Sequence, residues 1–448
     1  MSLFHSIFTS LFYFVIVIGV MVLVHEFGHF AVAKLLGVRV EQFAIGFGTR
    51  LFGFRKGDTD YRINALPFGG YVKMAGETPM DERSGDPGEF LSHPRWQRFL
   101  IAIAGPVMNI LLAIGLLTGV YMVHYEHPAY LDQHAVVGWV EHGSPAEKQG
   151  VQPGDRLVQV DGVQNPTWEQ VEVKQLLSAN QPLGFAVERG GQEIQGSIVP
   201  VATGNSEAGS AGWFPVEPVI IGDLESGMPA AQAGLKPGDK IISMGGQTVP
   251  SIQAMIERLQ QTQGKPVEVL VERGGKQLSF SLAPVLADTP GTAERHYRLG
   301  FKNSYETSVA QLSFVDALGR SIQDNKRYSL VLLELLGKLV QRKASLNTVS
   351  GPIGIAEQTG AAAEEKGWIP LLALSAAISL NLGIFNLLPI PIMDGGVILL
   401  LFIEGLMRRD ISIQIKERIY QAAFVFLVLF AALVVYNDIA KTIAQRLP

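Results

Sequence analysis

The sequence predicts a polytopic α-helical membrane protein that carries two copies of an α+β module outside the membrane. Three observations lead to this fold class. For a chain of 448 residues the composition is apolar, with a mean hydropathy of +0.23 and 17% charged residues, yet long polar stretches interrupt it. Four segments come close to the roughly 20 apolar residues that a helix needs to cross a bilayer. One pattern of residues also occurs twice in the longest polar stretch, at an offset of 84 residues.

The first apolar segment is expected to form a transmembrane helix within residues 1–36. It carries no charge from Ser6 to Val24, and its helical pattern continues through His25. A cleaved signal peptide is the alternative interpretation, but its basic start is missing, so we expect the helix to be retained. The other transmembrane helices are expected at residues 98–124, 369–395 and 419–448.

The distribution of Lys and Arg predicts the orientation of these helices. Neither residue occurs before Lys34, ten occur from Lys34 to Arg98, and the next is Lys148. Because cytoplasmic loops near membrane spans are enriched in Lys and Arg, residues 37–97 and the short segment 396–418 should be cytoplasmic. Both chain termini and the large insertion would then lie outside the cytoplasm.

Two features of the composition restrict the partners of the chain. The formal net charge of −5 gives no electrostatic reason to expect nucleic acid, because proteins that bind it present basic surfaces. The chain has no cysteine, so disulfides and thiolate metal sites are excluded. Any catalytic metal must therefore be held by nitrogen and oxygen ligands.

The repeated pattern divides the insertion into two modules, expected at residues 125–204 and 215–304. Each copy has a strand, a short helix that begins at a proline, a Pro-Gly-Asp turn and a second apolar strand. The copies resemble tandem PDZ domains, which are small, partly open β-barrels with helices. In that family a loop before the first strand binds the carboxylate of a peptide C-terminus, and a groove accepts the peptide as an added strand. Spacers or size filters that bind no peptide are an equally good interpretation. The resemblance would assign peptide binding to Gly138, Trp139, Gly222 and Asp223.

The chemistry of the chain is indicated by the sequence His25-Glu26-Phe27-Gly28-His29, an HExxH motif. Its two histidines stand at i and i+4, so they project from one helix face and can bind one zinc ion, with Glu26 beside the metal-bound water. The motif directly follows an uncharged apolar run, and ionisable residues inside a membrane helix are costly and by default functional. Two surface histidines and a glutamate at the cytoplasmic end of a helix are the alternative.

A third ligand is expected from another part of the chain, because a catalytic zinc has three protein ligands and an open position. No other histidine lies in an apolar segment, so a carboxylate is the expected donor. Asp394 ends the sequence Asn386-Leu387-Leu388-Pro389-Ile390-Pro391-Ile392-Met393-Asp394, at the cytoplasmic end of the third span. Its prolines break the helix, which membrane-depth backbone tolerates only where it is buried or lines a wet cavity. Taken alone, an Asp at a helix end is more often a cap.

Together these motifs resemble the site-2 protease family of intramembrane metalloproteases. The resemblance rests on HExxH in the first span, N-x-x-P-x-P-x-x-D-G in a later span and PDZ-like modules between them, and it covers essentially the whole chain. It implies His25, His29 and Asp394 as ligands of one zinc ion per chain, with Glu26 as general base. Iron or cobalt would suit the same ligands.

The family resemblance also implies a setting and a substrate class. The enzyme would lie in a bacterial inner membrane, with its PDZ domains and both termini in the periplasm. Its substrates would be single-span membrane proteins, foremost a pre-trimmed anti-sigma factor of an envelope stress response, with signal-peptide remnants as a second class.

A substrate helix must unwind before cleavage, and its extended stretch then needs hydrogen-bond partners. Residues 37–97 alternate apolar and polar residues between glycines, which predicts β-hairpins that reach the active site and pair with the substrate. An ordinary cytoplasmic hairpin is the alternative. In the third span, the resemblance suggests that Asn381 and Asn386 hydrogen-bond the substrate backbone, although such side chains also join helices to one another. The glycines expected at the substrate are Gly46, Gly48, Gly69 and Gly70.

Residues 305–368 have the helical spacing of apolar residues and the scattered charge of amphipathic helices that lie on the outer membrane surface. With the PDZ-like modules they would gate substrate entry, and a packing scaffold is the equal alternative. Two other function classes remain open, a non-enzymatic membrane scaffold whose PDZ domains bind peptide tails and a transporter. Neither of them explains why Asp394 and an HExxH motif occur at the same membrane depth.

Overall fold

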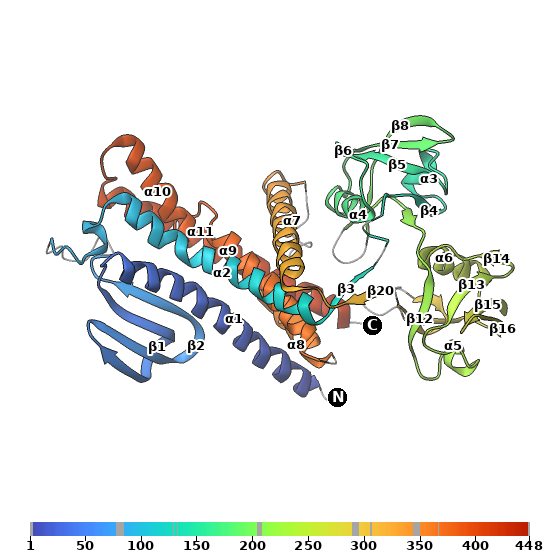
Figure 1. Ribbon diagram of the computed structural model, residues 1–448, viewed down its shortest axis with the longest axis horizontal. Helices are drawn as coiled ribbons and strands as arrows, with labels where there is room; N and C mark the ends of the chain where they lie inside the picture. Colours follow the sequence, from blue (N-terminus) through green and yellow to red (C-terminus); the bar gives the residue numbers. More distant parts are fainter. Residues whose placement is uncertain are drawn as a thin grey trace. The chain divides into compact units, whose positions relative to one another are not determined.

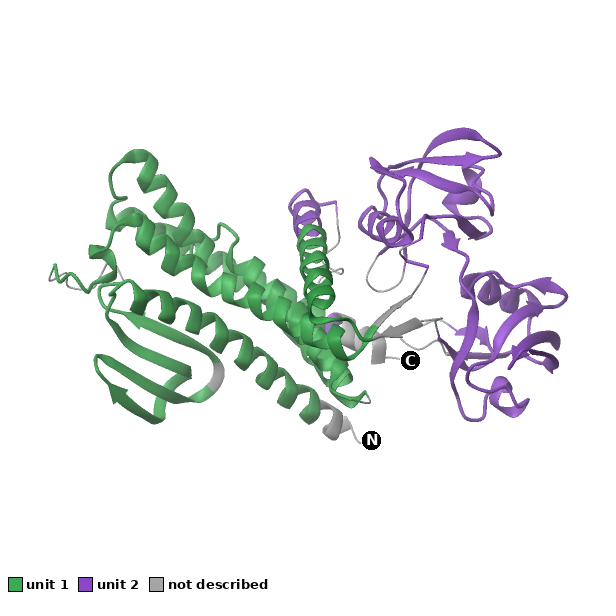
Figure 2. Ribbon diagram, viewed as in Figure 1, with its two compact units in different colours: residues 1–125, 311–332, 350–438 green, residues 126–310, 333–349, 439–448 purple. Residues whose placement is uncertain are grey.

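The computed structural model describes residues 3–77, 85–128, 130–131, 133–203, 208–288, 295–304, 307–343, 350–365 and 367–446 (Figure 1). The chain forms two compact units (Figure 2). Unit 1 comprises residues 1–125, 311–332 and 350–438, and unit 2 comprises residues 126–310, 333–349 and 439–448. Each unit is described by itself.

Unit 1 is built around four helices that are long and apolar enough to cross a membrane, as the sequence predicts. Their apolar side chains point in every direction, which is typical of helices surrounded by lipid and by other helices. Shorter segments complete the unit, including α10 (Asp394–Met407), which a short loop connects to the third span. The four long helices are α1 (Leu3–Leu35), α2 (Arg95–Val123), α9 (Ile369–Asn386) and α11 (Ile413–Arg446).

Helix α2 lies at the centre of this unit and packs against α1, α9 and α10 (Figure 1). Small residues allow the close approach of α1 and α2. A Cβ atom on Gly28 of α1 would lie only 2.5 Å from the backbone oxygen of Ala104 in α2. Apolar side chains fill the space between α1 and α9, where Val17, Met21 and Ile378 are buried together. Van der Waals packing of this kind, rather than burial from water, holds helices together in a bilayer.

The region between α1 and α2 forms a twisted hairpin of two long strands, β1 (Val40–Lys56) and β2 (Thr59–Met74), which end beside α1. The start of β1 pairs on both of its edges with β2, because Gln42 lies opposite Lys73 on one side and Asp60 on the other. The last part of β2, residues 69–74, therefore forms an outer edge of this sheet. A short 3₁₀ turn, Phe90–Ser92, leads into α2.

The segment expected to hold amphipathic helices contains α7 (Phe314–Val340) and α8 (Pro352–Glu364). The start of α7 is fixed to α2 by polar contacts, since buried Asp324 accepts a hydrogen bond of 2.8 Å from Tyr121. Helix α8 packs on α1. The side chain of Asp438 in α11 accepts hydrogen bonds from three backbone N–H groups at the start of α8.

Unit 2 contains two modules of the same design, each with its own buried core. The equivalence extends to single contacts. In the first module Arg189 Nε lies 2.6 Å from Asp155 Oδ1, and in the second Arg273 Nε lies 2.6 Å from Asp239 Oδ1. The second pair is the counterpart of the first at the sequence offset of 84 residues, so the repeat seen in the sequence is also a repeat of the structure.

The strands of the two modules form separate sheets, in the orders β6-β5-β7-β8 and β16-β15-β13-β12-β19, with β11 paired to β4 and β14 to β13. The first module contains β4 (Val137–Val140), α3 (Pro145–Lys148), β5 (Arg156–Val160), β6 (Val163–Gln164), α4 (Trp168–Leu177), β7 (Leu183–Arg189), β8 (Gln192–Ile198), β9 (Val201–Thr203), β10 (Ala208–Ser210) and β11 (Trp213–Pro215). The second contains β12 (Val219–Leu224), α5 (Pro229–Gln232), β13 (Lys240–Met244), β14 (Gln247–Thr248), α6 (Ile252–Thr262), β15 (Val267–Arg273), β16 (Lys276–Leu282), β17 (Val285–Asp288), β18 (Arg295–Arg298) and β19 (Phe301–Ser304). The insertion begins with β3 (Tyr125–Pro128) and ends with β20 (Thr307–Ala310), which pair with each other.

Candidate metal centre

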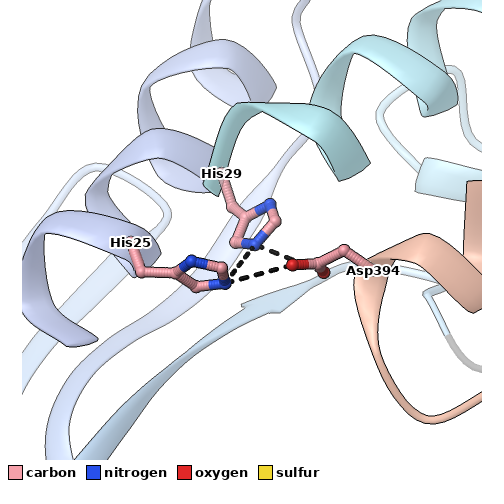
Figure 3. A group of neighbouring side chains, drawn as sticks. All are labelled: His25, His29 and Asp394. Carbon is pink, nitrogen blue, oxygen red and sulfur yellow. Dashed lines mark hydrogen bonds and ion pairs between the residues drawn. The ribbon is translucent and has the colours of Figure 1, made fainter. Parts of the chain in front are cut away.

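Three side chains from two distant parts of the chain meet in unit 1 (Figure 3). His25 and His29 lie one turn apart on α1, and Asp394 is the first residue of α10. The two Nε2 atoms are 3.2 Å apart. The carboxylate of Asp394 lies 3.1 Å from His25 Nε2 and 3.4 Å from His29 Nε2. This is the group of metal-type donors that the described residues bring within 4.8 Å of one another.

The spacing of these donors fits a zinc ion. Zinc bonds to imidazole nitrogen and carboxylate oxygen are about 2.0–2.2 Å long, so the ligands of a tetrahedral site lie roughly 3.3 Å from one another. All three separations are close to that value. In addition, Asp394 Oδ2 is buried and receives no hydrogen bond from the part of the chain that the structure describes. Two neutral imidazoles and one carboxylate also match the ligand chemistry that zinc prefers when thiolates are absent.

Glu26 lies on the neighbouring face of α1 and borders the same cavity as the three donors. The end of β2 runs alongside it. A Cβ atom on Gly70 would lie 3.4 Å from Glu26 Cγ, and the backbone N–H of Val72 donates a hydrogen bond to the Glu26 carboxylate. A carboxylate that shares a cavity with the metal donors can accept and return a proton.

The loop before α10 brings Asp394 to the histidines. Helix α9 ends at Asn386, and the chain folds back through a tight turn in which Ile390 N donates to Leu388 O at 2.7 Å. The turn requires glycine at the start of α10. A Cβ atom on Gly395 would lie 2.2 Å from Leu388 O, and one on Gly396 would lie 2.3 Å from Ile390 O. The Asp-Gly-Gly sequence is thus a condition for the position of the carboxylate.

Helix α2 forms the wall behind the histidines, and the sequence analysis did not identify its contribution. Residues Ile101, Gly105 and Asn109 follow one another at four-residue spacing and face α1. The backbone oxygen of Ile101 lies 2.8 Å from His29 Nδ1, and the amide of Asn109 lies 3.2 Å from His25 Nδ1. Between them, a Cβ atom on Gly105 would lie 2.3 Å from His29 Nε2. The four-residue spacing of a small and a polar residue in an apolar helix is the only sequence signal that could have marked this face.

The metal donors open onto a cavity of about 610 Å³. It extends from Glu26 and Asp394 to a second polar group, where the carboxylate of Glu404 in α10 lies 2.6 Å from Lys416 Nζ at the start of α11. Glu404 is 1% exposed, so this ion pair joins the two helices inside the protein. A cavity of this size can hold several residues of an extended peptide.

The residues expected to contact substrate lie at different places. Asn386 borders the cavity, whereas Asn381 is exposed on α9 and does not border it in the described structure. Gly69 and Gly70 lie on the outer edge of β2 near Glu26. The two remaining glycines shape the hairpin elsewhere: Gly46 and Gly48 have positive φ angles of 82° and 86°, and a Cβ atom on Gly46 would lie 2.4 Å from Leu66 O.

The residues assigned to peptide-binding loops lie instead within strands. Gly138 and Trp139 belong to β4, whose edge is paired with β11, and a Cβ atom on Gly138 would lie 2.4 Å from Val216 N. Gly222 and Asp223 belong to β12. The second module does contain an apolar cavity of about 190 Å³, but it lies between α6 and residues 296–303. The structure therefore places these four residues in strands rather than in loops, and their assignment to peptide binding stays a prediction.

Trp139 has a different role in the structure. Its indole Nε1 donates to Glu257 at 3.3 Å, and the guanidinium of Arg258 stacks over its ring at 5.4 Å. Both partners belong to α6, so Trp139 links the two modules within unit 2.

Comparisons with known proteins agree with this geometry. The model of peptidase family M50 matches residues 13–430. The chain is 32% identical to the regulator of sigma-E protease of Salmonella typhimurium, over 97% of this chain and 99% of the relative. It is also 32% identical to the regulator of sigma-E protease of Escherichia coli and to a putative zinc metalloprotease of Vibrio cholerae, over 96% of this chain and 98% of each relative. Among solved structures, the PDZ domain of an SdrC-like protein from Listeria monocytogenes matches 20% of this chain at 20% identity, with 90% of that domain covered and a TM-score of 0.17. That last similarity is too low to carry an argument.

Proposed function

Because the chain belongs to peptidase family M50, the site-2 protease family of zinc metallopeptidases, we propose that the cluster of His25, His29, Asp394 and Glu26 is its active site. The observation that carries this proposal is the convergence of three metal donors and one carboxylate on a single cavity inside a bundle of apolar helices. The two other function classes, a membrane scaffold without activity and a transporter, do not require this convergence.

In this proposal His25, His29 and Asp394 hold one zinc ion. When bound, zinc supplies a Lewis acid that activates water and polarises the carbonyl of the peptide bond. Glu26 takes the proton from the attacking water and returns it to the leaving nitrogen. The buried position of the histidines, at 7% and 8% exposure, keeps bulk water from the ligands and strengthens their electrostatic effect on the reaction.

The outer edge of β2 is the proposed binding site for the unwound substrate. Residues 69–74 leave one edge of the sheet unpaired within the described hairpin, and this edge passes beside Glu26. Peptides commonly bind to such edges by adding a strand, with the main chain supplying the hydrogen bonds. Asn386 also borders the cavity, and in this proposal its amide donates to the same backbone. Asn381 would have to act through a rearrangement, so we give it a smaller share of substrate binding.

The substrates we propose are single-span membrane proteins of a bacterial inner membrane, foremost an anti-sigma factor that another protease has already trimmed, with signal-peptide remnants as a second class. Relatives named for regulating sigma-E support this substrate class. The two modules of unit 2 would be periplasmic PDZ domains that admit only trimmed substrates. The cavity between α6 and residues 296–303 is the place where a peptide tail would bind.

The experiment that tests the proposal uses the full-length protein in lipid vesicles with a panel of single-span model substrates. The wild-type protein should cut within the membrane segment, as mass spectrometry of the products would show. The Glu26→Gln variant should retain one zinc ion per chain and cut nothing, because the shape of the side chain is kept while its proton acceptor is lost. The matched control is Glu365→Gln. Glu365 is exposed, and it does not border the cavity in the described structure. Substantial cleavage by the Glu26→Gln variant would contradict the assignment.

A further inference from the structure

The side chain of Asn109 lies at the back of the metal centre, where it is fully buried. Its Nδ2 atom is 3.2 Å from His25 Nδ1, and its Oδ1 atom has no hydrogen-bond partner in the described part of the chain. A buried amide oxygen without a partner is unfavourable by about 1–3 kcal/mol. An asparagine at this place therefore needs an explanation other than packing.

The tautomer of the neutral His25 ring decides which atom of this amide must point toward it. If the Asn109 NH₂ group donates to Nδ1, the proton of a neutral imidazole must sit on Nε2. Nε2 is the nitrogen that lies 3.1 Å from the Asp394 carboxylate and 3.2 Å from His29 Nε2. A protonated nitrogen cannot bind a metal, so this arrangement and metal binding exclude each other.

A half turn of the amide about its Cβ–Cγ bond resolves the conflict. It exchanges two atoms of nearly equal size, so the packing is unchanged, and the choice between the two orientations rests on the hydrogen bonds. With Oδ1 next to His25, the imidazole donates its Nδ1–H and presents the Nε2 lone pair to the metal. Ligating histidines in proteins are usually oriented by such an acceptor on the other ring nitrogen.

Two further contacts hold Asn109 in place without involving its amide. Ser379 Oγ in α9 donates to the backbone oxygen of Asn109 at 2.8 Å. Gly383, also in α9, packs so closely that a Cβ atom there would lie 3.4 Å from the Cβ of Asn109. The backbone and Cβ of Asn109 are thus held against α9, and the amide itself lies beside His25 of α1. His29 already has an acceptor of the required kind, the backbone oxygen of Ile101 at 2.8 Å.

We infer that Asn109 is a positioning residue of the metal centre: its amide oxygen accepts the Nδ1–H of His25 and so holds that imidazole in the tautomer and orientation that bind zinc. This inference rests on the proposed assignment of His25, His29 and Asp394 as ligands. It adds an α2 residue whose effect reaches the reaction through His25 rather than through the substrate.

The test measures metal affinity of the full-length protein in detergent, by competition of Zn²⁺ with a chromophoric chelator, and records the visible absorption of the Co²⁺ form. Asn109→Leu should weaken zinc binding by roughly 10- to 100-fold and alter the Co²⁺ spectrum. Asn109→Asp, which keeps an acceptor for Nδ1–H, should bind zinc at least as tightly as the wild-type protein. The matched control is Gly119→Ala in the same helix, where an added Cβ atom meets no described atom within 4 Å, so this variant should bind zinc like the wild type.

The order of the two Asn109 variants separates positioning from packing. If Asn109 only fills space, Leu is tolerated better than a buried carboxylate, and Asn109→Asp would bind zinc more weakly than Asn109→Leu. Weaker zinc binding by Asn109→Asp than by Asn109→Leu would overturn the inference. So would wild-type affinity in Asn109→Leu, or loss of folding in both variants. Failure of the proposed metal site is distinguishable, because Asp394→Asn would then bind zinc as tightly as the wild type, or the wild type itself would bind none.

Discussion

At the scale of single residues, the part of the site that lies within one helix is readable from the sequence. His25 and His29 share a face of α1 because four residues complete about one turn, and this relation holds in any helix. Gly105 and Asn109 could not be found in the same way. Helix α2 is mostly apolar, and the spacing of Gly105 and Asn109 is too weak a signal to fix which face turns toward α1. Only the packing of the two helices identifies these residues.

Gly105 provides a direct test of that packing. A methyl group in the Gly105→Ala variant would lie 2.3 Å from His29 Nε2, so the imidazole would have to leave the position in which it meets His25 and Asp394. We expect zinc affinity to fall by roughly 10-fold or more. Gly115→Ala in the same helix is the matched control, since a Cβ atom there has no described atom within 4 Å. Equal zinc affinity in both variants would show that α2 does not limit the geometry of the site.

At the scale of elements, alternation of apolar and polar residues predicts hairpins between α1 and α2, but not that β1 pairs with β2 on both edges. That arrangement depends on bends at positive-φ glycines such as Gly46, whose effect on register cannot be read from alternation alone. The sequence repeat is clearest at the start of each module, whereas the apolar cavity of the second module lies at its end, between α6 and residues 296–303. The repeat alone therefore does not locate this cavity.

The repeated ion pair of the modules makes their stability depend on pH. Hydrogen bonds from Arg273 lower the pKa of Asp239 below its usual value, and they outweigh the opposing effect of burial. A carboxylate with a lowered pKa in the folded state stabilises the fold above the pKa of the unfolded chain, near 3.9, and this contribution is lost as pH falls through the folded pKa. Asp239→Asn should therefore destabilise the second module by about 2 kcal/mol at pH 7 and by much less near pH 3.

Hydrogen exchange of the β15 amides in the full-length protein would measure this difference. The matched control is Asp223→Asn in the same module, because Asp223 is exposed and makes no ion pair with the described residues that the variant would break. Equal destabilisation by Asp239→Asn at both pH values would mean that the charge of the carboxylate does not matter.

At the scale of the whole molecule, segments that are distant in the sequence of unit 1 build the cavity. They include the end of α1, the outer edge of β2, the start of α2, the end of α9, helix α10 and the start of α11. The number of membrane helices follows from composition, because length and hydropathy suffice to define a span. Their mutual arrangement does not follow, since lipid-facing and helix-facing surfaces are equally apolar. The cytoplasmic and periplasmic assignment of the loops, made from Lys and Arg, stays a prediction.

We propose above all that one zinc ion is bound between α1 and α10 inside unit 1. The most direct measurement is anomalous diffraction at the zinc absorption edge, from crystals of the active full-length protein. We expect one strong peak, about 2 Å from His25 Nε2, His29 Nε2 and a carboxylate oxygen of Asp394. A zinc peak at any other place, or an active protein whose crystals show no metal among these three side chains, would contradict the account.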